Sequence, residues 1–90
     1  MPMVIARHKV QDYGEWRTAF DLDVEAQKAA GLTNPRVLRS VDDKNEVVIL
    51  FDIKDLKKAK EFVASPRLKE AMREAGVTDK PTIYFLESVS

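Results

Sequence analysis

The chain contains no cysteine and only one histidine among its 90 residues. Disulfide bonds are therefore excluded, and so are the usual zinc sites, which combine several Cys and His ligands. Glycine is also scarce, and the three glycines, at positions 14, 31 and 76, fall near the ends of expected helices. They form no loop of the kind that cradles phosphate groups. We expect neither a metal nor a cofactor.

Charge of one sign and long apolar runs are missing as well. Fifteen basic and fifteen acidic residues give a formal net charge of zero, and neither sign collects in a block. A nucleic-acid-binding protein normally shows a basic excess or stripe, so this class is set aside. No apolar run approaches the roughly 20 residues of a membrane span, and residues 1–10 are too short and too charged for a signal peptide. We expect a cytoplasmic protein with no membrane partner.

The length predicts one domain, residues 1–90. A chain of this size buries only about 60% of its unfolded surface, so its stability is marginal unless something is added. Because disulfides are excluded, oligomerisation is the common device that remains.

Residues 12–31 are predicted to form one helix. Asp12 can cap its start, Glu15 occupies the acidic position of a capping box, and Gly31 supplies a left-handed residue at its end. Aromatic and aliphatic residues recur at helical spacing and predict the buried stripe: Tyr13, Trp16, Phe20 and Val24.

The remaining pattern predicts four strands and a second helix. The strands are residues 3–10, 36–41, 46–53 and 82–89, with polar turn residues at 42–45 between the second and the third. The second helix begins after Asp55 and ends at Gly76, and Ser65-Pro66 divides it into two pieces. The sequence AGLTNP at 30–35 is repeated in part as AGVTD at 75–79, which suggests two related halves.

This order of elements predicts an α+β protein with the ferredoxin-like βαββαβ arrangement, in which two helices cover one face of a four-stranded antiparallel sheet. Residues 3–10 and 46–53 would be the central strands. Residues 47–51 are apolar at every position, so the face opposite the helices would also be apolar. Such a face is rarely left bare on a monomer. We therefore predict a homodimer that pairs its sheet faces and buries about 1,200 Å² or more in total.

With this element order, the strand MVIARHKV running into the helix DYGEWRTAF, and the closing strand TIYFLESV, the chain resembles the dimeric α/β-barrel superfamily, in particular small proteins related to antibiotic-biosynthesis monooxygenases. The resemblance implies two protomers that pair their sheets into a barrel with the helices outside. It also implies a small apolar pocket in each protomer, where an aromatic substrate meets oxygen without metal or flavin. Haem degradation is disfavoured because residues 62–75 contain no histidine.

His8 is the first candidate for a catalytic group. Relatives place a polar residue late on the first strand, facing the pocket, and His8 occupies the matching position. Histidine titrates near neutral pH, so His8 could act as a general base or orient a substrate. The alternative is a structural histidine that hydrogen-bonds the helix start or a backbone carbonyl.

Other side chains are predicted to bind the substrate. Trp16 and Phe20 could form an aromatic wall, and Arg39 could hold a carboxylate or enolate. The alternatives are core packing for the aromatic residues and a salt bridge or solvated edge for Arg39. The full set of predicted substrate-binding residues is Trp16, Phe20, Arg39, Phe62, Met72 and Tyr84. Asp52 is interpreted as structural, paired with Lys9 or Arg7 across the sheet.

Two functions therefore remain open. The first is a cofactor-independent monooxygenase or isomerase acting on a small aromatic or enolic metabolite, with His8 as the acid/base group and Arg39 or Tyr84 stabilising an anion. The second is a non-catalytic dimeric ligand-binding or stress-response module. An open cavity of a few hundred Å³ reaching the imidazole would favour the first function, and a filled core around His8 would favour the second.

Overall fold

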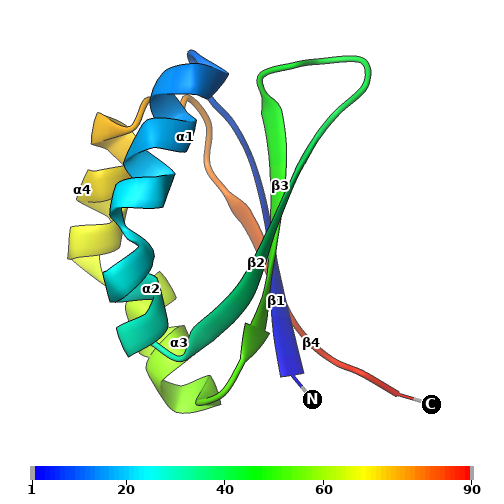
Figure 1. The fold of residues 1–90 in the computed structure, drawn as a ribbon, viewed down its shortest axis with the longest axis vertical. Coiled ribbons are helices and arrows are strands. Elements are labelled where there is room, and N and C mark those ends of the chain that lie inside the picture. The colour runs from blue at the N-terminus through cyan, green and yellow to red at the C-terminus, as the bar shows by residue number, and fades with distance from the viewer. Residues whose placement is uncertain (1, 90) are drawn as a thin grey trace.

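The computed structural model describes residues 2–89, and it contains four strands and four helices. The strands form one antiparallel sheet in the order β2-β3-β1-β4, and all the helices lie on one face of it (Figure 1). The elements in chain order are β1 (Pro2–Lys9), α1 (Tyr13–Leu22), α2 (Val24–Ala29), β2 (Leu32–Arg39), β3 (Glu46–Ile53), α3 (Leu56–Val63), α4 (Pro66–Glu74) and β4 (Thr82–Glu87). The predicted α+β, ferredoxin-like fold is confirmed, with β1 and β3 at the centre of the sheet.

The face of the sheet under the helices forms the core. Along β3 the burial alternates strictly, so that Val47, Ile49 and Phe51 point toward the helices and are buried. Val4 on β1 and Ala59 on α3 join the same cluster. Burying a side chain of the size of Val or Ile stabilises the folded state by about 1.5–3 kcal/mol. This one layer of side chains therefore contributes most of the free energy that holds the helices to the sheet.

The opposite face of the sheet is also apolar, and no helix covers it (Figure 1). At its centre Ile5 lies between Leu50 on β3 and Tyr84 on β4. Leu38 and Leu86 belong to the same face, where both are exposed. The doubly apolar character that the sequence predicts for β3 is therefore present in the fold.

The prediction of one continuous helix over residues 12–31 is wrong. The chain forms α1 and α2 with a break at Asp23, whose backbone lies at φ −94° and ψ 9°. Asp12 caps α1 as predicted, since its carboxylate accepts from the Glu15 N–H at 2.9 Å. The break rotates the following turn, so that Val24 is 36% exposed while Gln27 is buried. Val24 is therefore not part of the buried stripe.

The strand β2 begins earlier than predicted. It starts at Leu32 rather than Arg36, because a bulge between Thr33 and Arg36 accommodates the Asn34-Pro35 pair within the strand. Asn34 takes a positive φ of 52°, which asparagine tolerates better than most residues. Since β2 is an edge strand, the missing N–H of Pro35 costs little there.

The predicted division at Ser65-Pro66 is confirmed. The Ser65 hydroxyl accepts from the Leu68 N–H at 3.1 Å, and Pro66 is the first residue of α4. No residue of α4 is fully buried. This helix therefore packs loosely over the sheet and leaves room beneath it.

Two loops repeat the same geometry in the two halves of the chain. Gly31 and Gly76 both have positive φ, 81° and 89°, and each follows a helix. The Gly31 carbonyl accepts from Lys54, just after β3, and the Gly76 carbonyl accepts from Gln11, just after β1. The partial repeat in the sequence thus corresponds to two equivalent helix-to-strand connections, each tied to the end of a central strand.

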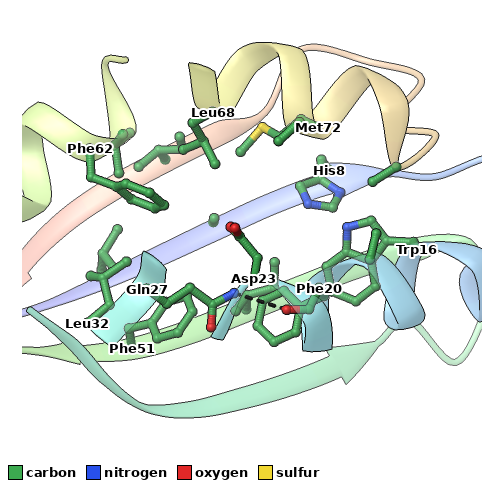
Figure 2. Close-up of a pocket in the computed structure, with 18 of the residues that line it drawn as sticks. His8, Trp16, Phe20, Asp23, Gln27, Leu32, Phe51, Phe62, Leu68 and Met72 are labelled. Carbon is green, nitrogen blue, oxygen red and sulfur yellow. Dashed lines mark hydrogen bonds between the residues drawn. The ribbon is translucent and has the colours of Figure 1, made fainter. Parts of the chain in front are cut away.

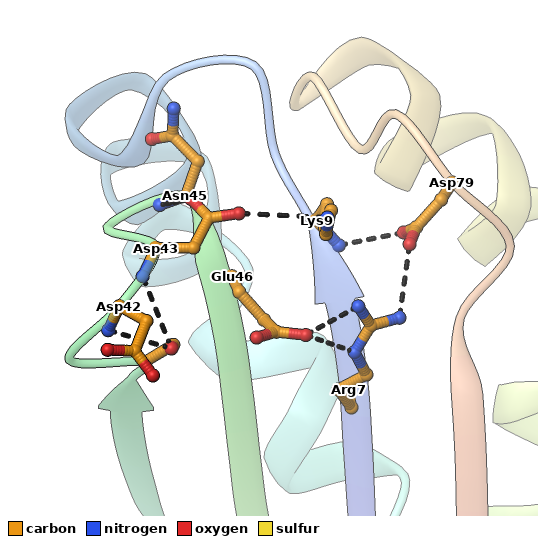
Figure 3. A network of polar contacts seen from close by, with 8 residues as sticks. Arg7, Lys9, Asp42, Asp43, Asn45, Glu46 and Asp79 are labelled. Carbon is orange, nitrogen blue, oxygen red and sulfur yellow. Dashed lines mark hydrogen bonds and ion pairs between the residues drawn. The ribbon is translucent and has the colours of Figure 1, made fainter.

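A polar network closes one end of the sheet (Figure 3). The Arg7 guanidinium on β1 pairs with Glu46 at 2.5 Å and with Asp79 at 3.1 Å. Asp79 also accepts from the Lys9 backbone N–H at 2.7 Å, and this bond, together with the Arg7 charge, lowers the pKa of its carboxyl group. The network fastens the loop before β4 to β1.

The predicted pairing of Asp52 with Lys9 or Arg7 is wrong. Asp52 pairs with Arg36 on the neighbouring edge strand at 2.7 Å and accepts from the Asn34 amide at 3.2 Å. It therefore stabilises the bulge of β2, a structural role as expected but with different partners.

The glycine at the end of α2 offers a direct test of this architecture. We expect Gly31→Ala to lower the free energy of unfolding by about 1–2 kcal/mol or more, because a Cβ there would meet Asp55 N at 3.0 Å in a left-handed backbone. Gly76→Ala should cost less, since its nearest contact would be at 3.6 Å. Gly14→Ala, in the first turn of α1 without positive φ, is the control and should be nearly neutral. Urea unfolding of the three variants checks this order, and equal losses for Gly31→Ala and Gly14→Ala would contradict it.

Candidate functional site

A cavity of about 330 Å³ lies between the helices and the covered face of the sheet. Figure 2 shows side chains from the helices and from the sheet pointing into this cavity. Most of the lining is aliphatic or aromatic, and the polar or charged members are His8, Asp23, Gln27 and Glu74. A mostly apolar cavity with a few converging polar groups is the usual form of a small-molecule site.

His8 enters this cavity from β1. It is 1% exposed and lies opposite Val47 in the sheet. Its Nδ1 is buried and has no hydrogen-bond partner among residues 2–89. Burial lowers the pKa of His8 below its ordinary value, while the nearby Asp79 charge partly opposes this effect. The imidazole is therefore neutral at neutral pH and can accept a proton.

A row of aromatic rings continues from the imidazole along one wall. The Trp16 ring meets the His8 ring edge-on at a centroid distance of 5.5 Å. Phe20 stacks on Trp16 at 5.0 Å, and Phe51 follows at 6.0 Å. These spacings are those of favourable aromatic pairs, so the rings hold one another in place and form a rigid wall of the cavity.

The opposite wall comes from the second pair of helices. Phe62 on α3 and Leu68 and Met72 on α4 point into the cavity (Figure 2). All three side chains are only partly buried. Because the Met side chain is flexible and polarisable, this wall can adjust to the shape of a ligand more easily than the aromatic wall can.

The break between α1 and α2 adds two polar residues that the sequence analysis did not select. The Phe20 carbonyl accepts from the Asp23 backbone N–H at 3.1 Å and from Gln27 Nε2 at 3.3 Å. Gln27, which is 5% exposed, thus satisfies a carbonyl where the helix is interrupted. The Asp23 carboxylate points into the cavity (Figure 2) and makes no side-chain cap bond to α2.

A signal for these two residues was present in the sequence. Trp16, Phe20, Asp23 and Gln27 follow one another at helical spacings of four, three and four, which places them on one face. Because Val24 is apolar, it was predicted to continue the buried stripe, and the polar residues Asp23 and Gln27 were left out of the predicted site. An aspartate within an apolar stripe indicates either an interruption of the helix or a functional group.

The structure brings five of the seven predicted site residues together, namely His8, Trp16, Phe20, Phe62 and Met72. Arg39 and Tyr84 do not line the cavity. The Arg39 guanidinium lies 4.0 Å from the centre of the Tyr13 ring and donates to the Lys44 carbonyl. Tyr84 is 58% exposed on the opposite face of the sheet. The predicted position of these two residues beside His8 is therefore wrong, because strand alternation turns Tyr84 away and Arg39 stands near the end of an edge strand.

Within residues 2–89 no three His, Cys, Asp or Glu side chains are grouped so that they could hold a metal ion. No helix in the same range is long and apolar enough to cross a membrane.

Comparison with known proteins gives a clear result only at the level of structure. The sequence matches no family model and no curated protein. The fold is similar to that of an antibiotic biosynthesis monooxygenase, with a TM-score of 0.73, 14% identity and full coverage of both chains. A conserved protein from Methanosarcina mazei Go1 is similar with a TM-score of 0.74 and 15% identity, over 98% of this chain and 92% of that one. SnoaB, a cofactor-independent oxygenase from Streptomyces nogalater, is similar with a TM-score of 0.70 and 16% identity, over 98% of this chain and 94% of that one.

These similarities confirm the resemblance to antibiotic-biosynthesis-monooxygenase-like proteins as a likeness of fold. The chain has the ferredoxin-like fold of that group along nearly its whole length. At such low identity the shared fold assigns no activity, since one fold supports many chemistries.

The burial of His8 predicts a pH dependence of stability. Its pKa is lowered in the folded protein, so the unfolded chain binds the proton more readily and stability falls as the pH drops below about 6.5. We expect the wild-type free energy of unfolding to decrease more steeply between pH 7.5 and pH 5 than that of His8→Gln, which cannot titrate at this position. Urea unfolding across this range is the measurement. Parallel profiles for the two proteins would contradict a depressed pKa at His8.

Proposed function

We propose that the protein is a cofactor-independent enzyme that acts on a small aromatic or enolic metabolite as a monooxygenase or isomerase. The observation that carries this proposal is the cavity of about 330 Å³ that reaches the buried imidazole of His8. Its volume suits a ligand of two or three fused rings, and its aromatic wall suits a flat one.

In this function His8 acts as the general base. A neutral imidazole has one ring nitrogen without a proton, and that nitrogen can take a proton from a phenol or enol bound in the cavity. The resulting anion is electron-rich at carbon. In an isomerase it is protonated again at a different carbon atom, and in a monooxygenase it reacts with oxygen.

The oxygenase reaction balances without a further reductant. For 1-naphthol, the ring carbon opposite the oxygen-bearing carbon bonds to O₂ to give a hydroperoxide, and cleavage of the O–O bond releases water and leaves a second carbonyl. The substrate and O₂ become 1,4-naphthoquinone and water, so the ring supplies the four electrons that O₂ takes up. The description of SnoaB as a cofactor-independent oxygenase supports this class of reaction on the shared fold.

Replacement of His8 tests the proposed role. We expect His8→Gln to lower the rate of oxygen uptake with 1-naphthol or 1,5-dihydroxynaphthalene by about 100-fold or more, because the general base is lost. An oxygen electrode and the absorbance of the quinone product provide the measurement. The control is Arg39→Gln, which lies outside the cavity and should keep the wild-type rate. An unchanged rate in His8→Gln would reject the assignment, and no turnover of any hydroxyarene by the wild type would reject the oxygenase.

One observation favours a second function, a non-catalytic ligand-binding module. Neither Arg39 nor Tyr84 lies beside His8, so the anion-stabilising partner expected for an enzyme is not one of these residues. Under this alternative the same cavity binds a ligand and no bond changes.

We also propose that the protein is a homodimer built through the uncovered face of the sheet. Ile5, Leu50 and Tyr84 form an apolar row across this face, with Leu38 and Leu86 exposed beside it. An exposed apolar patch of this kind usually marks an interface. Ion pairs between Arg7 and Glu46 and between Arg36 and Asp52 would border the contact. The cytoplasm remains the expected location.

The oligomeric state can be tested with a single charge. We expect the wild type to sediment as a dimer at micromolar concentration and Leu50→Lys to sediment as a monomer, because the lysine would be buried without a partner in the centre of the contact. Val41→Lys is the matched control, since Val41 is 98% exposed beyond the end of β2 and its replacement should leave the dimer intact. A monomeric wild type would contradict the proposal.

A further inference from the structure

The charged residues that line the cavity have one sign only. Among the lining residues within 2–89 there is no lysine or arginine, while Asp23 and Glu74 are acidic. Glu74 is exposed on α4, whereas Asp23 is partly buried at the helix break. A ligand that carries a carboxylate or phosphate would therefore meet repulsion and find no ion-pair partner.

The Asp23 carboxylate is available to a ligand. No hydrogen bond or ion pair joins it to another residue of the described chain, although Asp21, two residues earlier, is held by Arg17 at 3.1 Å. The bonds from Asp23 N–H and Gln27 Nε2 to the Phe20 carbonyl fix the break that turns the Asp23 side chain inward. The position of the carboxylate is thus set by the backbone, and its oxygens remain free as acceptors.

A second, independent feature points to a ligand in the same cavity. His8 is 1% exposed, yet its Nδ1 has no partner within the described chain, and the imidazole points into the cavity from the sheet (Figure 2). Unpaired buried polar atoms are uncommon in folded proteins. Trp16, Phe20 and Phe51 line the same cavity, and aromatic rings attract cations as well as flat rings.

We propose that this cavity takes an aromatic ligand whose polar substituent is a hydrogen-bond donor held by Asp23, with an ammonium group preferred, and that it rejects aromatic ligands that are already anionic when they enter. An anion formed in the cavity after His8 takes a proton is different, because the imidazolium balances its charge. The inference rests on the proposed function in that the same cavity binds the ligand, and it adds the charge and polarity of the substrate. Asp23 is the specificity-determining residue, and it acts by a charge-assisted hydrogen bond.

Three probes of nearly equal size test the selection: 2-naphthylmethylammonium, 2-naphthylmethanol and 2-naphthoate. We expect calorimetric titration at pH 7.5 to give the tightest binding for the ammonium, weaker binding for the alcohol and the weakest for the carboxylate. Asp23→Asn should weaken binding of the ammonium about tenfold or more, because one charge of the pair is removed, and should change binding of the alcohol by no more than about twofold.

Asp21→Asn is the matched control. It removes the same charge two residues away, outside the cavity, and should leave all three affinities within about twofold of the wild type. Equal or tighter binding of the carboxylate would overturn the charge selection, and an unchanged ammonium affinity in Asp23→Asn would overturn the assignment to Asp23. In both cases binding of the alcohol would leave the proposed function standing. If none of the three probes binds, both the charge selection by Asp23 and the proposal that this cavity binds the substrate are rejected.

Discussion

The edge-to-face contact between the His8 and Trp16 rings is the interaction on which the site depends. The chain's only histidine is thereby packed under the first helix, and its burial lowers the pKa of the imidazole. Because the Nδ1 atom finds no partner there, the fold carries a polar cost that packing alone does not explain. A ligand that hydrogen-bonds the imidazole would remove this cost, which connects the packing of β1 and α1 to a function.

The two pairs of helices, α1–α2 and α3–α4, contribute differently to the cavity. α1 supplies fixed aromatic rings in contact with one another and with Phe51 of the sheet. α4 has no buried residue and faces the cavity with flexible side chains such as Met72. A rigid wall opposite an adaptable one allows the shape of the ligand to vary while its plane stays fixed. Helices packed on one side of the sheet are sufficient for this arrangement, and no helix of the described chain covers the other side (Figure 1).

Much of the fold could be predicted from local patterns. The alternation along β3, the cap at Asp12 and the Ser65-Pro66 division are each determined by nearby residues, and all three are found in the structure. The features that were missed depend on tertiary contacts. The break at Asp23 is stabilised by Gln27 through the Phe20 carbonyl, and β2 extends through Asn34-Pro35 because β3 pairs with it on both sides of the bulge. For the site, helical spacing identified Trp16 and Phe20, whereas the placement of Arg39 and Tyr84 depended on strand position and facing direction, which the sequence left open.

We infer that a ligand lies against His8 and Trp16 in this cavity. The chain has one histidine and one tryptophan, so the imidazole and indole proton signals belong to single residues. The most direct measurement is therefore an NMR experiment that detects intermolecular nuclear Overhauser effects from bound 2-naphthylmethanol. We expect effects from the naphthyl protons to both the His8 and the Trp16 rings. Effects confined to Tyr84 and Leu50, on the opposite face of the sheet, would contradict it.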